Sequence, residues 1–216
     1  MQIDISGLML ANSRAHAKRF FSRQHYVRAD MDNMPLCDGS VDLVFSSLAY
    51  QWCNNLDRVY PECFRLLKTN APFIFSMLGP DTLKELRSSW ASVDGDVHVN
   101  DFVDMHDVGD ALARTGFQGV VMDVETITLE YKDCVHLMRE LKQVGAQNVN
   151  TSRQKTLTGK NKVQQMISAY EQFRKNGMLP ATYEIVYGLA WKPAIDQSRH
   201  AGGVSYVPVE TIKKRR

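Results

Sequence analysis

Short apolar runs and longer amphipathic stretches follow one another along the chain. Residues 41–46 are apolar except for Asp42, as expected for a strand that is covered on both faces in a parallel sheet. Residues 73–77 form a similar run, and the intervening 56–68 carry apolar side chains at helical spacing. Strands that alternate with helices in this way predict an α/β domain, with a mostly parallel sheet and helices on both of its faces.

The second half of the chain continues these patterns with one irregularity. A helix is expected to end at Gly116, because glycine readily adopts the left-handed conformation that closes many helices. The alternation of residues 120–131 then changes phase, so we expect a bulge or a break near Glu125. Residues 133–178 are typical of two helices joined by a polar stretch, and 183–191 alternate as a closing strand.

Two prolines bear on where helices begin. Pro61 falls inside the expected helix 56–68, where a proline removes a backbone donor and costs about 3 kcal/mol unless the helix begins there. Residues 79–81 are expected to open the next helix, with Pro80 near its first position.

The composition limits the class of protein but does not indicate a function. A chain of 216 residues with 44% hydrophobic content is enough for one α/β domain with a substantial core. The net charge of +2 is too small to argue for a nucleic-acid partner. No apolar run approaches the length of a membrane span and no signal peptide opens the chain, so we expect a cytoplasmic protein without membrane contact.

The candidate metal ligands show no spacing that is typical of a metal site. The four cysteines have no CxxC pair and no neighbouring histidine at ligand distance, so they are interpreted as reduced, packed thiols. A second group is interpreted as part of a polar loop, because its spacing is irregular: His98, Asp101, Asp104 and His106. We therefore expect no metal.

Polar residues stand at the ends of the first expected strands. Asp4 ends a short strand and is followed by Ser6, which is expected to cap a helix. Asp30 follows a second strand, and Ser46 and Ser47 end a third. The carboxyl ends of parallel strands lie along one edge, where open α/β sheets bind ligands. A carboxylate at such a position often only caps a helix, but it can also accept two hydrogen bonds from a vicinal diol.

Five runs of residues, in order, resemble the class I S-adenosylmethionine-dependent methyltransferases, and within them the malonyl-acyl-carrier-protein O-methyltransferases of biotin synthesis. These runs are residues 45–52, 75–83, 105–112, 138–146 and 179–183. The resemblance extends from Asp4 to about Trp191 and implies a Rossmann-like fold with a helical lid inserted before the last strand. It implies methyl transfer from S-adenosylmethionine to the free carboxylate of malonyl-acyl-carrier protein.

The resemblance also implies the division of the chain and the roles of site residues. A methyltransferase domain would span 1–195, with the lid at about 133–178, and a tail would follow at 196–216. Asp4 matches the acid that takes the ribose hydroxyls, with Ile5 beside it. Asp30 matches the acid that receives the adenine amino group, and Met31 the residue that covers the ring. The loop beside the methionine part of the cofactor is matched by Ser46, Ser47 and Leu48.

The substrate side of the implied site rests on basic residues. A malonyl carboxylate is ionised at pH 7, so the reaction needs no strong base. Arg139 is our candidate for holding that carboxylate, and the alternative is a surface charge beside Lys142 on one helix face. Acyl carrier proteins are acidic, so docking would be steered by Lys142, Arg153, Lys155 and Lys160. We expect a monomer that binds this carrier and no nucleic acid.

The chain departs from the family in two places. None of its thirteen glycines forms a GxG pair, and the chain begins at what resembles the family's second strand. The family usually has two glycines in the turn 68–71, so this turn is built differently or carries strain. In the family, the first strand lies between the strands that match those ending here at Asp4 and Ser46. The resemblance thus implies that its loss would cost roughly as much free energy as the whole stability of an ordinary domain, 5–15 kcal/mol.

Three readings of the missing strand stay open: a wrongly placed start, the C-terminal piece of a split gene, or an impaired remnant. The alternatives to methyl transfer are a protein-arginine hydroxylase, as in a respiratory complex I assembly factor of the same architecture, and a protein without catalytic activity. Because all of these share one fold, the sequence alone does not separate them.

Overall fold

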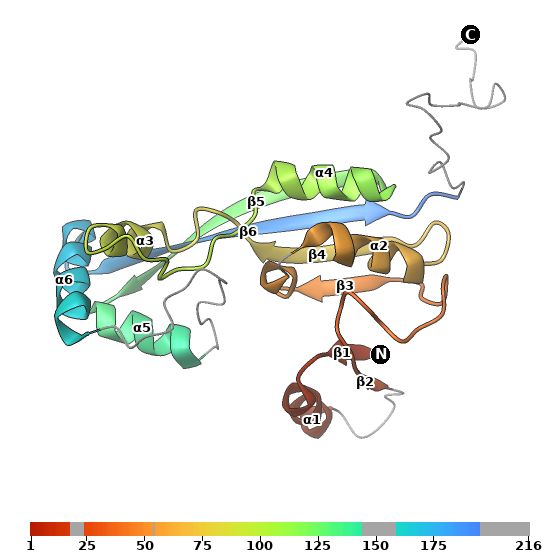
Figure 1. Cartoon of the computed structure of the whole chain (residues 1–216), viewed down its shortest axis with the longest axis horizontal. Helices are drawn as coiled ribbons and strands as arrows, with labels where there is room; N and C mark the ends of the chain where they lie inside the picture. Colours follow the sequence, from red (N-terminus) through yellow and green to blue (C-terminus); the bar gives the residue numbers. More distant parts are fainter. Residues whose placement is uncertain (18–23, 54, 144–158, 195–216) are drawn as a thin grey trace, which may run out of the picture.

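The computed structural model describes residues 1–17, 24–53, 55–143 and 159–194. Its main sheet has the strand order β3-β4-β6-β5 (Figure 1). The bounds of these strands are β3 Val44–Ser47, β4 Pro72–Leu78, β6 Leu179–Trp191 and β5 Gln118–Tyr131. Strands β3 and β4 pair in parallel, and β6 runs antiparallel to both of its neighbours. Three of the four strands therefore run in one direction, which confirms the mostly parallel sheet.

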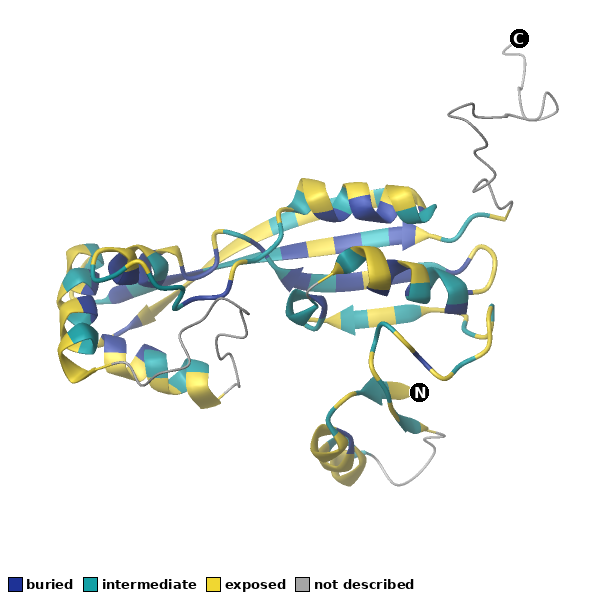
Figure 2. Cartoon of the chain, in the orientation of Figure 1, coloured by how far each residue is buried: buried dark blue, intermediate teal, exposed yellow. Residues whose placement is uncertain are grey.

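The first two strands form a separate sheet. Strands β1 (Gln2–Asp4) and β2 (Tyr26–Arg28) pair in parallel, and α1 (Gly7–His16) lies between them in the chain. The hydroxyl of Ser6 accepts a hydrogen bond from the N–H of Met9 at 3.3 Å, which confirms the predicted helix cap. Only one residue of α1 is buried, and the helix is exposed along its length (Figure 2). Among the described residues no ladder joins this sheet to the main one.

One face of the main sheet is covered by α2 (Leu56–Leu66) and α4 (Met105–Thr115), which pack against each other (Figure 1). Beneath them lies a buried cluster that is rich in aromatic rings, with the short helical turn η1 (Tyr50–Trp52) at its side. The rings of Phe73 and Phe75 stack with centroids 4.8 Å apart. Gly188 of β6 lies opposite Phe75, and a Cβ atom there would overlap the Phe75 ring.

A second buried cluster lies at the far ends of β5 and β6. It is formed by α3 (Lys84–Ala91), α5 (Cys134–Gln143) and α6 (Lys160–Tyr170), and a helical turn, η2 (Glu171–Phe173), follows α6. Figure 1 shows these three helices together at one end of the molecule. Within the described segments, no helix is long and apolar enough to cross a membrane.

Both ends of α4 follow from side chains that the sequence places there. The carboxylate of Asp104 accepts a hydrogen bond from the N–H of His106 at 2.7 Å and so caps the start of the helix. Gly116 ends it with φ +102°, which confirms the predicted glycine cap.

The prediction of a bulge or break near Glu125 is wrong. Strand β5 pairs with β6 without interruption from Val121 to Tyr131, and the irregularity lies between Gln118 and Val121. Val120, Met122 and Val124 pack against the first cluster, whereas Tyr131 belongs to the second. Successive side chains of a strand point to opposite faces of the sheet. The change of phase in the hydrophobic alternation therefore marks the point along β5 where the face that is covered by helices changes.

The helix expected to open at residues 79–81 begins later, at Lys84, so this prediction is also wrong. The N–H of Gly79 donates to the carbonyl of Glu184 at 2.9 Å, and that of Leu83 donates to the carbonyl of Thr182 at 2.6 Å. These bonds hold the segment against β6 and leave it as a turn. Leu83 lies in the left-handed region with φ +55°.

The turn after α2 is built differently from a glycine turn, as predicted. Asn70 adopts φ +61°, and its N–H donates to the carbonyl of Lys192 at 2.9 Å. Asparagine tolerates this left-handed conformation better than most residues. The turn therefore fixes the start of β4 against the end of β6.

Pro61 lies inside α2 and is exposed to solvent. We expect Pro61→Ala to raise the free energy of unfolding by about 2–3 kcal/mol, because it restores the N–H that a helix interior needs and removes the ring clash. The measurement is urea unfolding followed by circular dichroism. Pro72→Ala at the start of β4 is the control, and it should change stability by less than about 1 kcal/mol. Equal changes in both variants would contradict a local effect on the helix.

Candidate functional site

Two acidic residues lie at the carboxyl ends of adjacent parallel strands. Asp4 is the last residue of β1 and is opposite Arg28, while Asp30 follows two residues after the end of β2. The N–H of Ala29 donates to the carbonyl of Asp4 at 3.3 Å, which keeps the two strand ends together. Both acids are therefore on one edge of this sheet, as the strand-end pattern predicted.

Each of these carboxylates uses one oxygen in a local hydrogen bond. Oδ1 of Asp4 accepts from the N–H of Ser6 at 2.7 Å, and Oδ1 of Asp30 accepts from the N–H of Asp32 at 3.4 Å. The other oxygen of each has no hydrogen-bond partner among the residues that the structure describes. Both groups can thus accept further hydrogen bonds, which is what hydroxyls or an amino group of a ligand require.

The end of β3 is strained. Leu48 adopts φ +50°, a conformation that costs a residue with a bulky side chain about 1–2 kcal/mol. Its N–H donates to the carbonyl of Ser76 at 2.9 Å, and the hydroxyl of Ser76 donates to that of Ser47 at 3.3 Å. The Leu48 side chain is 42% exposed. Strain of this kind is concentrated at ligand-binding positions in proteins.

The segment after β2 contacts the segment after β3. The sulfur of Met31 lies 2.9 Å from that of Cys53, and Asp32 forms an ion pair with Arg58 at 3.4 Å. Burial raises the pKa of the Cys53 thiol to about 11, so it is protonated at neutral pH and does not act as a nucleophile. The structure therefore brings the loop of Asp30 and Met31 close to the segment that follows Ser46, Ser47 and Leu48.

The structure does not bring Arg139 to these residues. Arg139 and Lys142 are exposed on α5, which lies with α3 and α6 at one end of the molecule, away from β1 and β2 (Figure 1). Lys160 is exposed at the start of α6. Arg153 and Lys155 lie outside the described residues.

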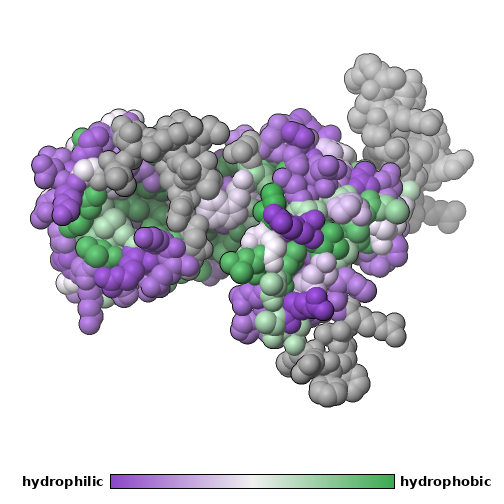
Figure 3. Space-filling model, turned by 60° about the horizontal axis from the view of Figure 1, so that its bottom comes forward, coloured by the Kyte–Doolittle hydropathy of each residue, from purple (hydrophilic) through white to green (hydrophobic). Residues whose placement is uncertain are grey.

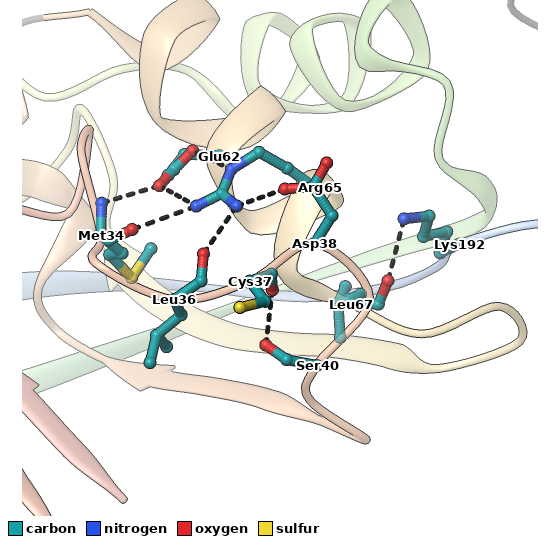
Figure 4. Close-up of polar contacts among 9 residues, drawn as sticks. All are labelled: Met34, Leu36, Cys37, Asp38, Ser40, Glu62, Arg65, Leu67 and Lys192. Carbon is teal, nitrogen blue, oxygen red and sulfur yellow. Dashed lines mark hydrogen bonds and ion pairs between the residues drawn. The ribbon is translucent and has the colours of Figure 1, made fainter.

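An arginine that no sequence pattern singled out holds the segment between β2 and β3. Arg65 of α2 donates to the carbonyl of Leu36 at 2.7 Å and to that of Met34 at 3.1 Å, and it also pairs with Asp38 (Figure 4). Two further bonds, of 2.7 and 2.8 Å, join it to both carboxylate oxygens of Glu62. In the sequence, Arg65 is distinguished only by its position on the polar side of a predicted helix. Its partners lie up to 31 residues away along the chain.

Among the described residues one group has the spacing of metal ligands, namely Asp94, Asp96 and His98, whose ligand atoms lie within 4.8 Å of one another. The ammonium of Lys162 lies 2.7 Å from Asp94 and 3.6 Å from Asp96. It already balances the negative charge that would attract a cation. This group is therefore an ion-pair network that joins α6 to the segment after α3.

Comparison with known proteins places these observations in a family. A family model described as a methyltransferase domain matches residues 1–75. The chain is 47% identical over 200 residues to the malonyl-[acyl-carrier protein] O-methyltransferase of Laribacter hongkongensis, covering 89% of this chain and 67% of the relative. It is 44% identical over 209 residues to the enzyme of the same name from Gallionella capsiferriformans, covering 94% and 72%.

The fold agrees with these similarities. The phosphoethanolamine N-methyltransferase 2 of Haemonchus contortus, solved with S-adenosyl-L-methionine, is similar with a TM-score of 0.52 at 19% identity, over 88% of this chain and 42% of that one. The sheet and its helices define a class I methyltransferase fold. The matched stretch spans between 56% and 72% of the length of four such curated relatives. The chain belongs to the malonyl-[acyl-carrier protein] O-methyltransferase family.

The Arg65 network generates a stability prediction. We expect Arg65→Met to lower the free energy of unfolding by about 1–3 kcal/mol at pH 7, because the Glu62 carboxylate and the two backbone carbonyls lose their donor. Urea unfolding measures the difference. Arg58→Met, which removes only an exposed ion pair, is the matched control and should change stability by less than about 1 kcal/mol.

The same variant should show a pH dependence. The hydrogen bonds from Arg65 hold the pKa of the Glu62 carboxyl below its ordinary value. A lowered folded-state pKa gives stability that is present above the unfolded-state pKa and is lost as pH falls through the folded-state value. The difference between wild type and Arg65→Met should therefore shrink on acidification below about pH 4.5. A difference that grows in acid would contradict this account.

Proposed function

We propose that this chain binds S-adenosylmethionine and transfers its methyl group to the free carboxylate of malonyl-acyl-carrier protein. The observation that carries the proposal is the pair of acids, Asp4 and Asp30, at the ends of adjacent parallel strands in a chain of this family. A pair of acids so placed can bind the two polar parts of a nucleoside, the ribose hydroxyls and the adenine amino group.

The residues present fit the nucleoside half of this cofactor. Asp4 and Asp30 each keep an oxygen available for it, and Met31, which follows Asp30 and is only partly buried, would supply apolar cover. Ile5 is 62% exposed directly after β1, where an apolar side chain can contact a sugar or an adenine ring. In our proposal these four residues bind the nucleoside.

The methionine half would lie at the end of β3. Ser46 and Ser47 provide hydroxyls there, and the left-handed backbone of Leu48 turns the chain away from the strand end. The bound cofactor supplies an electrophilic methyl group on a sulfonium. Because the accepting carboxylate is already ionised, the protein has to orient the reacting groups and exclude water, and no strong base is required.

The carrier protein would meet the α5–α6 end of the molecule. We propose that α5 and α6 belong to a lid at about residues 133–178, of which 144–158 lie outside the described part of the chain, and that Arg139 on α5 binds the malonyl carboxylate when the lid lies over the cofactor. Arg139, Lys142 and Lys160 are all exposed and basic, as required for docking of an acidic carrier. The division into a domain at 1–195 and a tail at 196–216 stays a prediction, and residues 195–216 lie outside the described part of the chain.

The cofactor site is tested by binding. We expect Asp4→Asn and Asp30→Asn each to weaken S-adenosylmethionine binding about tenfold, because each loses a charge-assisted hydrogen bond worth roughly 1.5–3 kcal/mol. Isothermal titration calorimetry measures the dissociation constants. Asp42→Asn changes an exposed acid that pairs with Lys68 and should leave the affinity unchanged. Equal losses in all three variants, or no binding by the wild type, would overturn the assignment.

The substrate site is tested by kinetics. We expect Arg139→Ala to raise KM for malonyl-acyl-carrier protein about tenfold, with the KM for S-adenosylmethionine unchanged, because only the malonyl carboxylate loses a cationic partner. Methyl transfer to purified malonyl-carrier provides the measurement. Arg174→Ala removes an arginine that pairs with Glu171 and serves as the control. Equal rises in both KM values would remove Arg139 from the substrate site.

A further inference from the structure

Helix α5 is packed more firmly in its first half than in its second. The carboxylate of Asp133 accepts a hydrogen bond from the N–H of His136 at 2.8 Å and so caps the start of the helix. Cys134 and Leu137 are buried in the second cluster. No side chain of residues 138–143 is buried. Apolar packing therefore fixes the first turn of α5 and leaves the second half to other contacts.

The surface around α5 is hollowed rather than filled. Figure 3 shows hydrophobic surface inside a hollow at the end of the molecule that carries α3, α5 and α6. Leu129 of β5 is 45% exposed, and Val135 of α5 is 46% exposed. Met138 and Leu141 pack against the second cluster but are only partly buried. Because apolar contact is incomplete here, a single polar contact has a large influence on how the second half of α5 lies.

One carboxylate in the second half of α5 is bound from the sheet. The hydroxyl of Tyr131, the last residue of β5, donates to Oε2 of Glu140 at 2.8 Å. Burial and the hydrogen bond to Glu140 raise the pKa of Tyr131, so this hydroxyl remains a donor at neutral pH. The other oxygen of Glu140 lies 3.3 Å from Nε2 of His136, one turn earlier on the same helix. We call Tyr131, Glu140 and His136 the α5 tether.

The α5 tether bears on the direction of Arg139. Successive residues of an α-helix point about 100° apart, so a helix that is held with Glu140 toward β5 has a fixed direction for Arg139 as well. Arg139 is exposed and forms no ion pair with a described residue. Its guanidinium is therefore available to an anion, and the tether decides where that guanidinium points.

We propose that Tyr131 and Glu140 are positioning residues for methyl transfer, whose hydrogen bond sets the rotation of α5 and thereby the direction in which Arg139 meets the malonyl carboxylate. The inference rests on the proposed function, in which Arg139 binds that carboxylate. Neither Tyr131 nor Glu140 touches the substrate. Without their bond, Arg139 would spread over many directions, and binding geometry is lost when a group moves by more than about 0.5 Å from its productive place.

A second tyrosine–glutamate bond in the chain provides a matched control. The hydroxyl of Tyr187 on β6 donates to Oε2 of Glu125 on β5 at 3.0 Å. These two strands are already joined by their backbone ladder, so loss of this bond leaves every helix in place. Replacement of either tyrosine by phenylalanine removes one hydroxyl and keeps the ring.

The tether is tested first without substrate or cofactor. We expect Tyr131→Phe to speed hydrogen exchange at the amides of residues 139–143 at least fivefold, because this half of α5 loses its contact with the sheet. Mass spectrometry measures the rates, and circular dichroism checks that the variant is folded. Tyr187→Phe should leave the rates within twofold of wild type. Unchanged rates in Tyr131→Phe, or equal rises in both variants, would overturn the proposal.

The effect on the substrate is tested by kinetics. Tyr131→Phe should raise KM for malonyl-acyl-carrier protein about fivefold and leave kcat and the KM for S-adenosylmethionine within twofold, a split that a general loss of structure does not give. In an Arg139→Ala background the same substitution should have no further effect, since the residue that the tether directs is gone. Independent effects of the two substitutions would remove the positioning role.

A conservative variant separates the hydrogen bond from the charge. Glu140→Gln keeps an oxygen that can accept from Tyr131 but removes the negative charge beside Arg139. It should match wild type within twofold, both in the exchange of residues 139–143 and in the KM for malonyl carrier. A Glu140→Gln variant as impaired as Tyr131→Phe would assign the effect to the charge and contradict a positioning bond.

Methyl transfer and the tether can fail separately. If the protein transfers no methyl group, the proposed function fails, and the exchange rates still decide whether the tether holds α5. If Arg139→Ala raises KM for malonyl carrier and Tyr131→Phe does not, the proposed function stands and the positioning role is wrong. If Tyr131→Phe raises it and Arg139→Ala does not, the bond acts on another group, and the inference fails.

Discussion

The pairing of β6 with both of its neighbours is the constraint on which the fold depends. This strand bonds to β4 along one edge and to β5 along the other. Val186 and Ala190 on one of its faces belong to the first cluster, whereas Leu179 and Ala181 on the other belong to the second. A shift of the β6 register by one residue would move every side chain of the strand to the other face and expose both of these buried sets. The register of β6 therefore fixes the two halves of the molecule at once.

The candidate site depends on a second, more local set of bonds. The acids at the ends of β1 and β2 belong to a sheet that has no ladder with the main one among the described residues. Their position relative to β3 comes from the segment that follows Asp30. Arg65 donates hydrogen bonds to two backbone carbonyls of that segment. Met31, within the segment, contacts Cys53. Side chains rather than a continuous sheet thus bring the strand ends together.

Features with nearby causes could be predicted from the sequence. The caps at Ser6 and Gly116 each involve only neighbouring residues, and both were predicted correctly. The turn at 79–81 was mistaken for a helix, because the bonds that hold it come from β6; the hydroxyl of Thr82 donates to a carbonyl 102 positions along the chain. The positions of Asp4 and Asp30 follow from the rule for strand ends. The role of Arg65 could not be found, since all of its partners except Glu62 are neighbours only in the folded chain.

The arrangement of two clusters along one pair of strands has an evolutionary consequence. The cores share β5 and β6 and otherwise draw on different helices, so a substitution within α5 or α6 changes the packing at one end only. The two ends of the molecule can therefore accumulate substitutions at different rates while the chain remains one folded unit. The exposed basic surface of α5 and α6 can thus diverge between species while the end that carries Asp4 and Asp30 stays as it is.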